Sequence, residues 1–302
     1  MNFKLYKKNW LLSLGLLFLT LGLIALSIFQ GNISSESIKT ANNVYTIPYW
    51  VLILFVIILA PILEEFIFRG VFTKNKKIKW FSLFTVSIFV ILSNNIAFQI
   101  LFVVYLISLI YNNSKRTSFS YNSLIVINSL LFSIAHIDNE RLLIIEASIS
   151  PLFIRFALGL FFIWICINFS IIKSMLFHAS WNIIPLVFLS YSIFFPNPKV
   201  ENFENNDLQV TWHRISKTSS KVNIYPKGQQ NSILSESEAL FLLKSVEWSK
   251  EKNDSIIKNY IPMEPYMSYK FNIKLKDTTN KSKNLHKKIE TFLMESKLIE
   301  IN

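Results

Sequence analysis

Two adjacent glutamates and an arginine directly follow an uncharged apolar stretch of the chain. The stretch reads TIPYWVLILFVIILA over 46–60, and PILEEFIFRG over 61–70 contains Glu64, Glu65 and Arg69. Positions four apart share a face of a helix, so Glu65 and Arg69 are able to pair. Glu64 is turned about 100° away, at 3.6 residues per turn, and has no partner nearby in the sequence. The spacing predicts a Glu65 that is fixed by Arg69 and a Glu64 that is free to act as a general base.

Two further apolar segments carry histidines. LLFSIAHIDN contains His136 four residues after Phe132, and SMLFHASWNIIP contains His178 and Asn182, four residues apart on one helical face. A single histidine within a membrane is usually a hydrogen-bonding residue between helices. Two histidines, an asparagine and two glutamates on three separate segments instead predict a polar cavity that holds water. Counted along straight helices at about 1.5 Å per residue, these side chains do not lie at one level.

These residue types suit the hydrolysis of an amide bond. The reaction needs a base that takes a proton from water and donors for the negative charge that develops on the carbonyl oxygen. Histidine and carboxylate are also ligands of zinc, so a divalent metal held by Glu64, His136 and His178 is an alternative. The H-E-x-x-H signature of soluble zinc proteases is absent from the sequence. The residues themselves leave open whether a metal takes part.

The distribution of apolar residues divides the chain into two parts. The chain has 302 residues, of which 52% are hydrophobic, and these residues crowd into the region before position 197. This distribution predicts a transmembrane domain over 1–196 and a soluble extension over 197–302. The expected fold of the first part is an all-α polytopic membrane helical bundle of about seven spans, with six and eight as alternatives. The candidate spans are 10–29, 47–68, 80–94, 96–112, 121–137, 151–169 and 173–195.

The extension over 197–302 has the pattern of a small α+β domain. The segments VTWHRIS, KVNIYP and SYKFNIKL alternate like strands, whereas SESEALFLLKSVEWSKEK and KNLHKKIETFLMESKLIE have helical periodicity. The letters SESE have the serine-then-glutamate pattern of a helix start. No segment of the extension contains a motif for chemistry, so the functional residues are expected in the transmembrane domain.

The placement of lysine and arginine predicts the orientation. Basic residues precede the first apolar run and follow the second, fourth and sixth, whereas the other connections are neutral or acidic. Since basic loops remain in the cytoplasm, the N-terminus is expected there, and seven spans would place the extension outside. The abundance of Ile, Asn and Lys is compatible with an AT-rich bacterial genome, and the expected location is a bacterial plasma membrane. The basic residues that make this pattern are Lys4, Lys7, Lys8, Arg69, Lys74, Lys76, Lys77, Lys79, Lys115, Arg116 and Lys173.

Composition also bears on the redox state and on the partners. The single cysteine, Cys166, lies in an apolar run, so a disulfide framework is excluded and a small buried hydrophobe is expected. The net charge of +12 comes largely from short loops between apolar runs, and no basic stripe or RNA-binding motif is present. Nucleic acid is therefore not an expected partner. The expected partners are membrane lipids and a peptide or membrane-protein substrate.

Taken in order, the polar motifs resemble those of a known family, the CAAX protease and bacteriocin-processing (CPBP, or Abi) family of intramembrane proteases. The resemblance covers roughly residues 46–195 and does not extend to the soluble part. An extra apolar hairpin separates the first two motifs here. The motifs that carry the resemblance are Glu64-Glu65-x-x-x-Arg69, Phe132-x-x-x-His136 and His178-x-x-x-Asn182.

The resemblance implies an intramembrane endopeptidase of the CAAX prenyl endopeptidase type, a family commonly labelled metalloprotease. By this resemblance Glu64 and His136 activate a water molecule, whereas His178 and Asn182 stabilise the tetrahedral oxyanion. The cofactor, if there is one, would be a divalent metal such as zinc. The residues expected to be catalytic are Glu64, Glu65, His136, His178 and Asn182, supported by Arg69 and Phe132.

Two other functions are compatible with polar residues inside a membrane. A transporter coupled to ions or protons would use the same glutamates and histidines as a path. Such a protein typically has broken helices rich in Gly and Pro at repeated positions, whereas this chain has 6 Gly and no visible repeat. A non-catalytic scaffold that acts through the extension is the other alternative, and the intact motifs argue against it.

Overall fold

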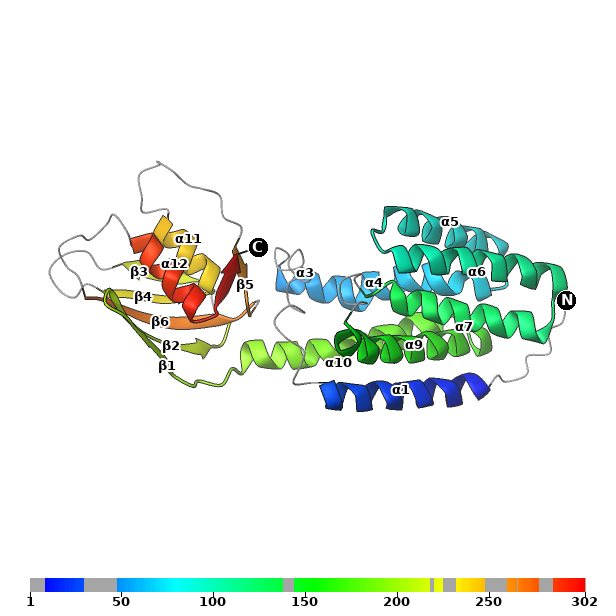
Figure 1. Ribbon diagram of the computed structural model, residues 1–302, viewed down its shortest axis with the longest axis horizontal. Helices are drawn as coiled ribbons and strands as arrows, with labels where there is room; N and C mark the ends of the chain where they lie inside the picture. The colour runs from blue at the N-terminus through cyan, green and yellow to red at the C-terminus, as the bar shows by residue number, and fades with distance from the viewer. Residues whose placement is uncertain are drawn as a thin grey trace. The chain divides into compact units, whose positions relative to one another are not determined.

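The computed structural model divides into two compact units (Figure 1). The helical unit contains the described residues up to Ile183, apart from Pro48 and Tyr49. These two residues and the described residues from Ile184 onward form the second unit. The division therefore falls inside a helix and not at the expected boundary after residue 196. The structure describes residues 9–29, 48–137, 144–217, 220–224, 232–247, 260–264, 266–276 and 285–301.

Apolar helices make up the first unit, and each predicted span contains one. The second span combines α-helical, π-helical and 3-10 turns, which follow one another without a break from Tyr49 to Phe72. The last helix, α10, runs across the division between the units. The elements are α1 (Asn9–Phe29), α3 (Tyr49–Leu54), η3 (Phe55–Leu59), α4 (Ala60–Glu64), η4 (Glu65–Arg69), η5 (Gly70–Phe72), α5 (Lys76–Leu92), α6 (Ile96–Lys115), α7 (Ser118–Ile134), α9 (Ile145–Asn168) and α10 (Ile171–Phe194).

Five helical segments among the described residues are long and apolar enough to cross a membrane. They are α1, the segment from Tyr49 to Phe72, α6, the part of α9 from Ser148 to Asn168, and α10. Helices α5 and α7 have 17 residues each, fewer than the roughly 20 that a bilayer core requires. The structure supports a membrane protein with a helical bundle, whereas the expected count of about seven spans is not confirmed.

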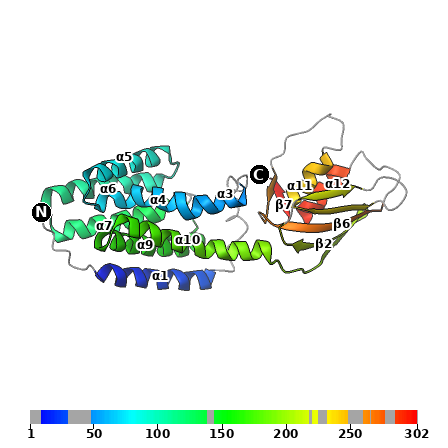
Figure 2. The same cartoon turned by 180° about the vertical axis from the view of Figure 1, so that it is seen from behind.

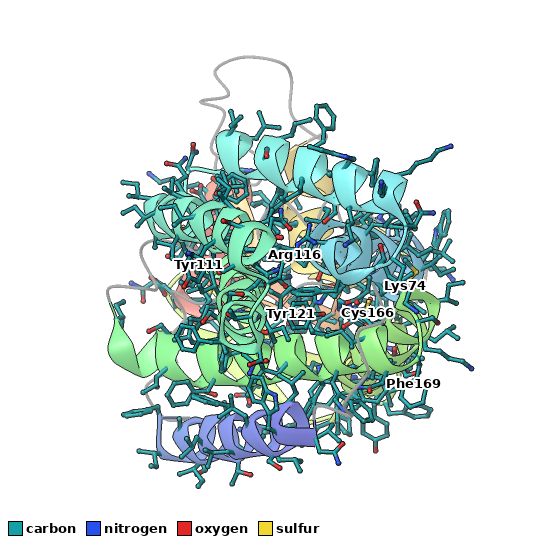
Figure 3. All side chains as sticks on the ribbon, turned by 90° about the vertical axis from the view of Figure 1, so that its right-hand side faces the viewer. Lys74, Tyr111, Arg116, Tyr121, Cys166 and Phe169 are labelled. Carbon is teal, nitrogen blue, oxygen red and sulfur yellow. The ribbon has the colours of Figure 1, made fainter. Side chains whose placement is uncertain are left out.

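The connections that were predicted to share one side of the membrane lie at one end of the helical unit. Figure 3 looks onto this end, where Lys74, Arg116 and Phe169 lie. Lys74 follows the second span, Arg116 follows α6, and Phe169 follows α9 and precedes Lys173. The predicted basic residues Lys4, Lys7 and Lys8 lie outside the described residues.

Helix α1 packs along α9, and two glycines allow the close approach. The two helices lie side by side in opposite views (Figures 1 and 2). A Cβ atom at Gly15 would lie 2.6 Å from the ring of Phe161, and one at Gly22 would lie 2.7 Å from the side chain of Ile154. The hydroxyl of Ser150 donates to the carbonyl oxygen of Gly22 at 2.9 Å. Close packing of this kind is typical of helix pairs in membranes, where dispersion and hydrogen bonds drive association.

Replacing Gly22 with Leu is expected to destabilise the protein by about 1–3 kcal/mol, because the new side chain overlaps Ile154. Thermal unfolding of the purified protein in detergent measures this effect. The matched control is Leu23→Phe on the same helix, since Leu23 is 52% exposed and has room for a larger side chain. Equal unfolding midpoints for Gly22→Leu and the native protein would contradict the close contact between α1 and α9.

A five-stranded antiparallel sheet with two helices forms most of the second unit, so the predicted α+β domain is confirmed. The strand order is β1-β2-β6-β4-β3, and β5 pairs separately with β7. The ring of Phe292 on α12 contacts Trp212 and Phe271 in the core between helix and sheet. The elements are β1 (Glu201–Glu204), β2 (Leu208–Ile215), β3 (Lys221–Ile224), β4 (Ser232–Ser237), α11 (Ala239–Glu247), β5 (Tyr260–Pro262), β6 (Ser268–Leu275), α12 (Leu285–Glu295) and β7 (Ile299–Ile301).

Strand β4 lies where the sequence prediction placed the start of a helix, and β1, β5 and β7 were not predicted. The letters SESE, taken as the start of a helix, lie mostly in this strand, and α11 begins directly afterwards at Ala239. The three predicted strands correspond to β2, β3 and β6, and the two predicted helices correspond to α11 and α12.

Candidate active site

The second span departs from a regular α-helix on both sides of the acidic pair. Two π-helical turns, η3 and η4, flank α4, which contains Pro61 near its start. A π-helical turn takes one extra residue and so changes which side chains face the neighbouring helices, and such turns are frequent at functional sites. Here Glu64 is the last residue of α4, and η4 buries Glu65, Phe68 and Arg69.

Glu65 is fully buried, and two hydrogen-bond donors and one cation surround its carboxylate. Its Oε2 accepts a hydrogen bond from the hydroxyl of Ser174 at 2.5 Å. Its Oε1 lies 3.0 Å from Nδ1 of His178 and 3.5 Å from Nη1 of Arg69. A carboxylate accepts only, so these two donors and the nearby guanidinium suit its anionic form. The predicted pairing of Glu65 with Arg69 is present, and Glu65 also orients His178.

Arg69 is fully buried between aromatic rings. Its guanidinium carbon lies 3.9 Å from the centre of the Phe132 ring and 5.0 Å from that of Phe162. Within the described part of the chain, its three side-chain nitrogens have no hydrogen-bond partner. The charge is therefore compensated by the Glu65 carboxylate and by the ring faces. The same Phe132 ring packs edge-to-face against the His136 ring, with 4.7 Å between the ring centres. Phe132 therefore lies between the Arg69 guanidinium and the His136 imidazole.

One oxygen of Glu64 faces both histidines. Its Oε2 lies 3.3 Å from Nε2 of His136 and 3.7 Å from Nε2 of His178. The side chains of Glu64 and His136 are 24% and 30% exposed, whereas that of His178 is 6% exposed. The site therefore has an open side at Glu64 and His136 and a closed side at Glu65. The three residues come from distant parts of the chain, and the fold brings them together.

The second nitrogen of each imidazole determines where the hydrogens lie. Nδ1 of His136 is 2.8 Å from the carbonyl oxygen of Phe132, and Nδ1 of His178 is 3.0 Å from Glu65. Both oxygens are acceptors, so each Nδ1 carries a hydrogen. In a neutral ring Nε2 then has a lone pair, and two such lone pairs beside a carboxylate oxygen repel it. A proton on one of the three atoms turns one of these two contacts into an attractive one, so the group is suited to hold and transfer a proton.

His136 lies in a turn that residues of two other helices stabilise. The predicted span 121–137 implied that His136 lies inside a helix. Helix α7 instead ends at Ile134, so His136 follows the helix. The side-chain amide of Asn95 donates to the carbonyl of Ile137 at 2.6 Å, and Arg155 donates to the carbonyl of His136 at 2.8 Å. These contacts hold the imidazole beside Glu64.

Sequence reasoning missed three residues of the site, although each gave a signal. Asn95 belongs to the short polar break between two apolar runs, and Arg155 is the one charged residue in the run 151–169. Ser174 lies four residues before His178, hence on the same helical face. None of the three belongs to the motifs that carry the family resemblance.

Asn182 has a different position from the other predicted site residues. It lies one turn beyond His178 on α10, and its side-chain nitrogen donates to the carbonyl oxygen of Val56 in η3 at 2.9 Å. Its amide is therefore engaged with the backbone of the second span. The predicted residues that the structure brings into one cluster are Glu64, Glu65, Arg69, Phe132, His136 and His178.

The same geometry bears on the metal alternative. Over the described ranges, no group of three or more His, Cys, Asp or Glu side chains is arranged to hold a metal ion. Glu64, His136 and His178 as placed thus do not fit a three-ligand site, and the zinc suggested by the sequence stays a prediction. The chemistry that the cluster itself offers is that of its acids and bases. The predicted burial of Cys166 is confirmed, and its thiol forms no disulfide.

Removing the Ser174 hydroxyl is expected to lower the free energy of unfolding by about 1.5–3 kcal/mol, the range for hydrogen bonds to charged groups. Ser174→Ala leaves Oε2 of Glu65 buried without its donor. Ser180→Ala on the same helix is the control, because Ser180 is exposed and bonds only its own helix, at the carbonyl of Leu176. Thermal unfolding in detergent compares the two variants. An equal effect of both substitutions would show that Ser174 contributes nothing specific to the site.

Comparison with known proteins gives no match, whether to a family model, to a characterised protein or to a solved structure. The functional assignment therefore depends on the geometry of the cluster and on the resemblance of the three motifs.

Proposed function

We propose that this protein is an intramembrane endopeptidase similar to the CPBP family. The observation that carries the proposal is the convergence of two imidazoles on one carboxylate oxygen: Nε2 of His136 and Nε2 of His178 lie 3.3 and 3.7 Å from Oε2 of Glu64. Glu64 and His178 lie within apolar helices and His136 directly follows one, and ionisable residues in such segments of a membrane protein are costly and usually serve a function. A base, a second proton carrier and an oriented histidine are the groups that amide hydrolysis requires.

The nucleophile in this mechanism is a water molecule that binds on the open side, beside Glu64 and His136. Glu64 accepts a proton from the water, with His136 holding the water in place, and the water oxygen forms a bond to the carbonyl carbon of the substrate. Nε2–H of protonated His178 donates to the oxyanion. Glu65 stabilises this imidazolium from the Nδ1 side, as the buried carboxylate does in a serine protease triad. The C–N bond then breaks, and the proton passes from Glu64 to the departing amine.

The proposal includes the membrane and the orientation. The protein would lie in a bacterial plasma membrane, with the basic end of the helical unit and the N-terminus in the cytoplasm. The predicted seven crossings are an odd number, so they would place the two ends of the chain on opposite sides. Residues 197–302 would then face the outside. The substrate would be a peptide or a membrane protein that reaches Glu64 and His136 from the bilayer or its surface.

Comparison of membrane-derived peptides in cells that produce the native protein or Glu64→Gln tests the proposal. New peptide ends are expected only with the native protein. The matched control is Glu204→Gln, since Glu204 is 61% exposed in the second unit and should not affect cleavage. Identical peptide sets in all three strains, together with ion-dependent flux in vesicles, would favour the transporter. Cleavage by the purified protein in the presence of a chelator decides separately whether a metal takes part.

A further inference from the structure

The second span has a gap in its backbone hydrogen bonding, one turn before the acidic pair. In η3 the N–H of Ala60 donates to the carbonyl of Phe55, five residues back instead of four. The next residue, Pro61, has no N–H and so cannot continue the pattern. The carbonyl of Val56 is thereby left without the backbone donor that either a π-helical or an α-helical pattern would give it.

Asn182 supplies the missing donor from another helix. Its side-chain nitrogen lies 2.9 Å from the carbonyl oxygen of Val56. An unpaired carbonyl is costly at an apolar site because no water replaces the donor. Kinks at proline in membrane helices are tolerated where a neighbouring side chain satisfies the freed carbonyl in this way. The amide of Asn182 thus compensates for Pro61.

Helix α10 holds the second span at two levels. Ser174 and His178 bind Glu65, and Asn182, on the same face of α10, binds Val56. Along α10 the contacts from Ser174 to Asn182 cover eight residue steps, whereas along the second span those from Val56 to Glu65 cover nine. The extra residue of the π-helical turn accounts for this difference, so the two helices stay in register.

We propose that Asn182 is a positioning residue: it clamps the π-helical turn η3 of the second span to α10 and so fixes the place of Glu64 and Glu65. The resemblance to the CPBP family implies a different role, direct donation to the oxyanion. The clamp itself is independent of any activity, whereas its effect on catalysis rests on the proposed function. The two roles differ in what should restore an Asn182→Ala variant.

A double-mutant cycle between Asn182→Ala and Pro61→Ala tests the clamp. Alanine at position 61 restores an N–H to the gap, so the amide of Asn182 is no longer needed there. Asn182→Ala alone is expected to lower the unfolding midpoint in detergent by roughly 2–4 °C, the shift for one lost hydrogen bond in a chain of this size. In the Pro61→Ala background the same substitution is expected to cost less than half of that. Equal costs in the two backgrounds would overturn the proposal.

A second variant covers the case in which Pro61→Ala does not fold. Asn182→Asp has the shape of asparagine, but it donates to Val56 only when its carboxyl group is protonated. Its midpoint relative to the native protein is therefore expected to rise when the pH falls from 7 to 5. A difference that does not depend on pH would contradict the clamp.

Cleavage rates then separate the clamp from a direct catalytic role. If Asn182 acts only by positioning, Pro61→Ala/Asn182→Ala should cleave within about threefold of Pro61→Ala, whereas a lost oxyanion donor would leave a deficit of about 10²–10³-fold. A deficit of that size in the double variant would overturn the positioning role. If the native protein cleaves nothing, the proposed function fails, and the unfolding measurements still decide the clamp.

Discussion

Glu64→Gln is expected to lower the rate of peptide cleavage by about 10²–10⁴-fold, the usual contribution of general acid–base catalysis. Oxygen Oε2 of Glu64 is the atom on which His136 and His178 converge. A glutamine side chain has the same size but cannot accept and return a proton. The measurement is the initial rate of cleavage of a membrane peptide by the purified protein in detergent or in vesicles.

Two comparisons make the result on Glu64 specific. The unfolding midpoint of Glu64→Gln should remain close to that of the native protein, because Glu64 is part-exposed and is not held by Arg69 as Glu65 is. Glu204→Gln, a change of the same chemistry on the surface of the second unit, should retain full activity. Retention of most activity by Glu64→Gln would mean that another group is the base.

Arg69→Ala is expected to cause the largest loss of stability of any substitution considered, about 3–5 kcal/mol. It leaves the carboxylate of Glu65 fully buried without its cation and removes the group that fills the space between the rings of Phe132 and Phe162. The yield of inserted protein and its thermal unfolding in detergent measure this loss.

Removal of both charges is the control for Arg69. Glu65→Gln/Arg69→Met keeps much of the buried volume and leaves no unpaired charge, so it should recover a large part of the stability lost in Arg69→Ala. Cleavage is not expected to recover, because His178 loses its carboxylate partner. If Arg69→Ala has native yield and midpoint, the ion pair contributes nothing to folding.

Hydrophobic patterning was sufficient to locate the helices but not to count the spans. Each apolar run forms a helix because its backbone groups must be paired internally in an apolar environment. Helices α5 and α7 begin earlier in the chain than the predicted spans 80–94 and 121–137, because capping side chains set their first turns: Asn75 accepts from Lys77 N–H, and Thr117 accepts from Ser120 N–H. Strand β4 was missed because three of its buried residues are serines, and the hydroxyls of Ser235 and Ser237 satisfy each other at 2.6 Å.

The candidate site shows where local spacing stops being informative. The pairing of Glu65 with Arg69 could be predicted because it depends on neighbours four residues apart. The position of His136 at the same level as Glu64 could not be predicted, because the estimate used straight helices. The second span contains π-helical turns, and His136 lies beyond the end of α7. The target of Asn182 was equally hidden, since it depends on a carbonyl group that Pro61 leaves unpaired.

Only one of the two imidazoles is within easy reach of a covalent inhibitor. An electrophile that enters from the open side meets His136, which is 30% exposed, before His178, which is 6% exposed. The ring of His178 also stacks on Phe162 at 4.4 Å, which shields one of its faces. Alkylation should therefore discriminate between two chemically similar side chains by access alone, and a warhead aimed at His136 needs no intrinsic preference for it.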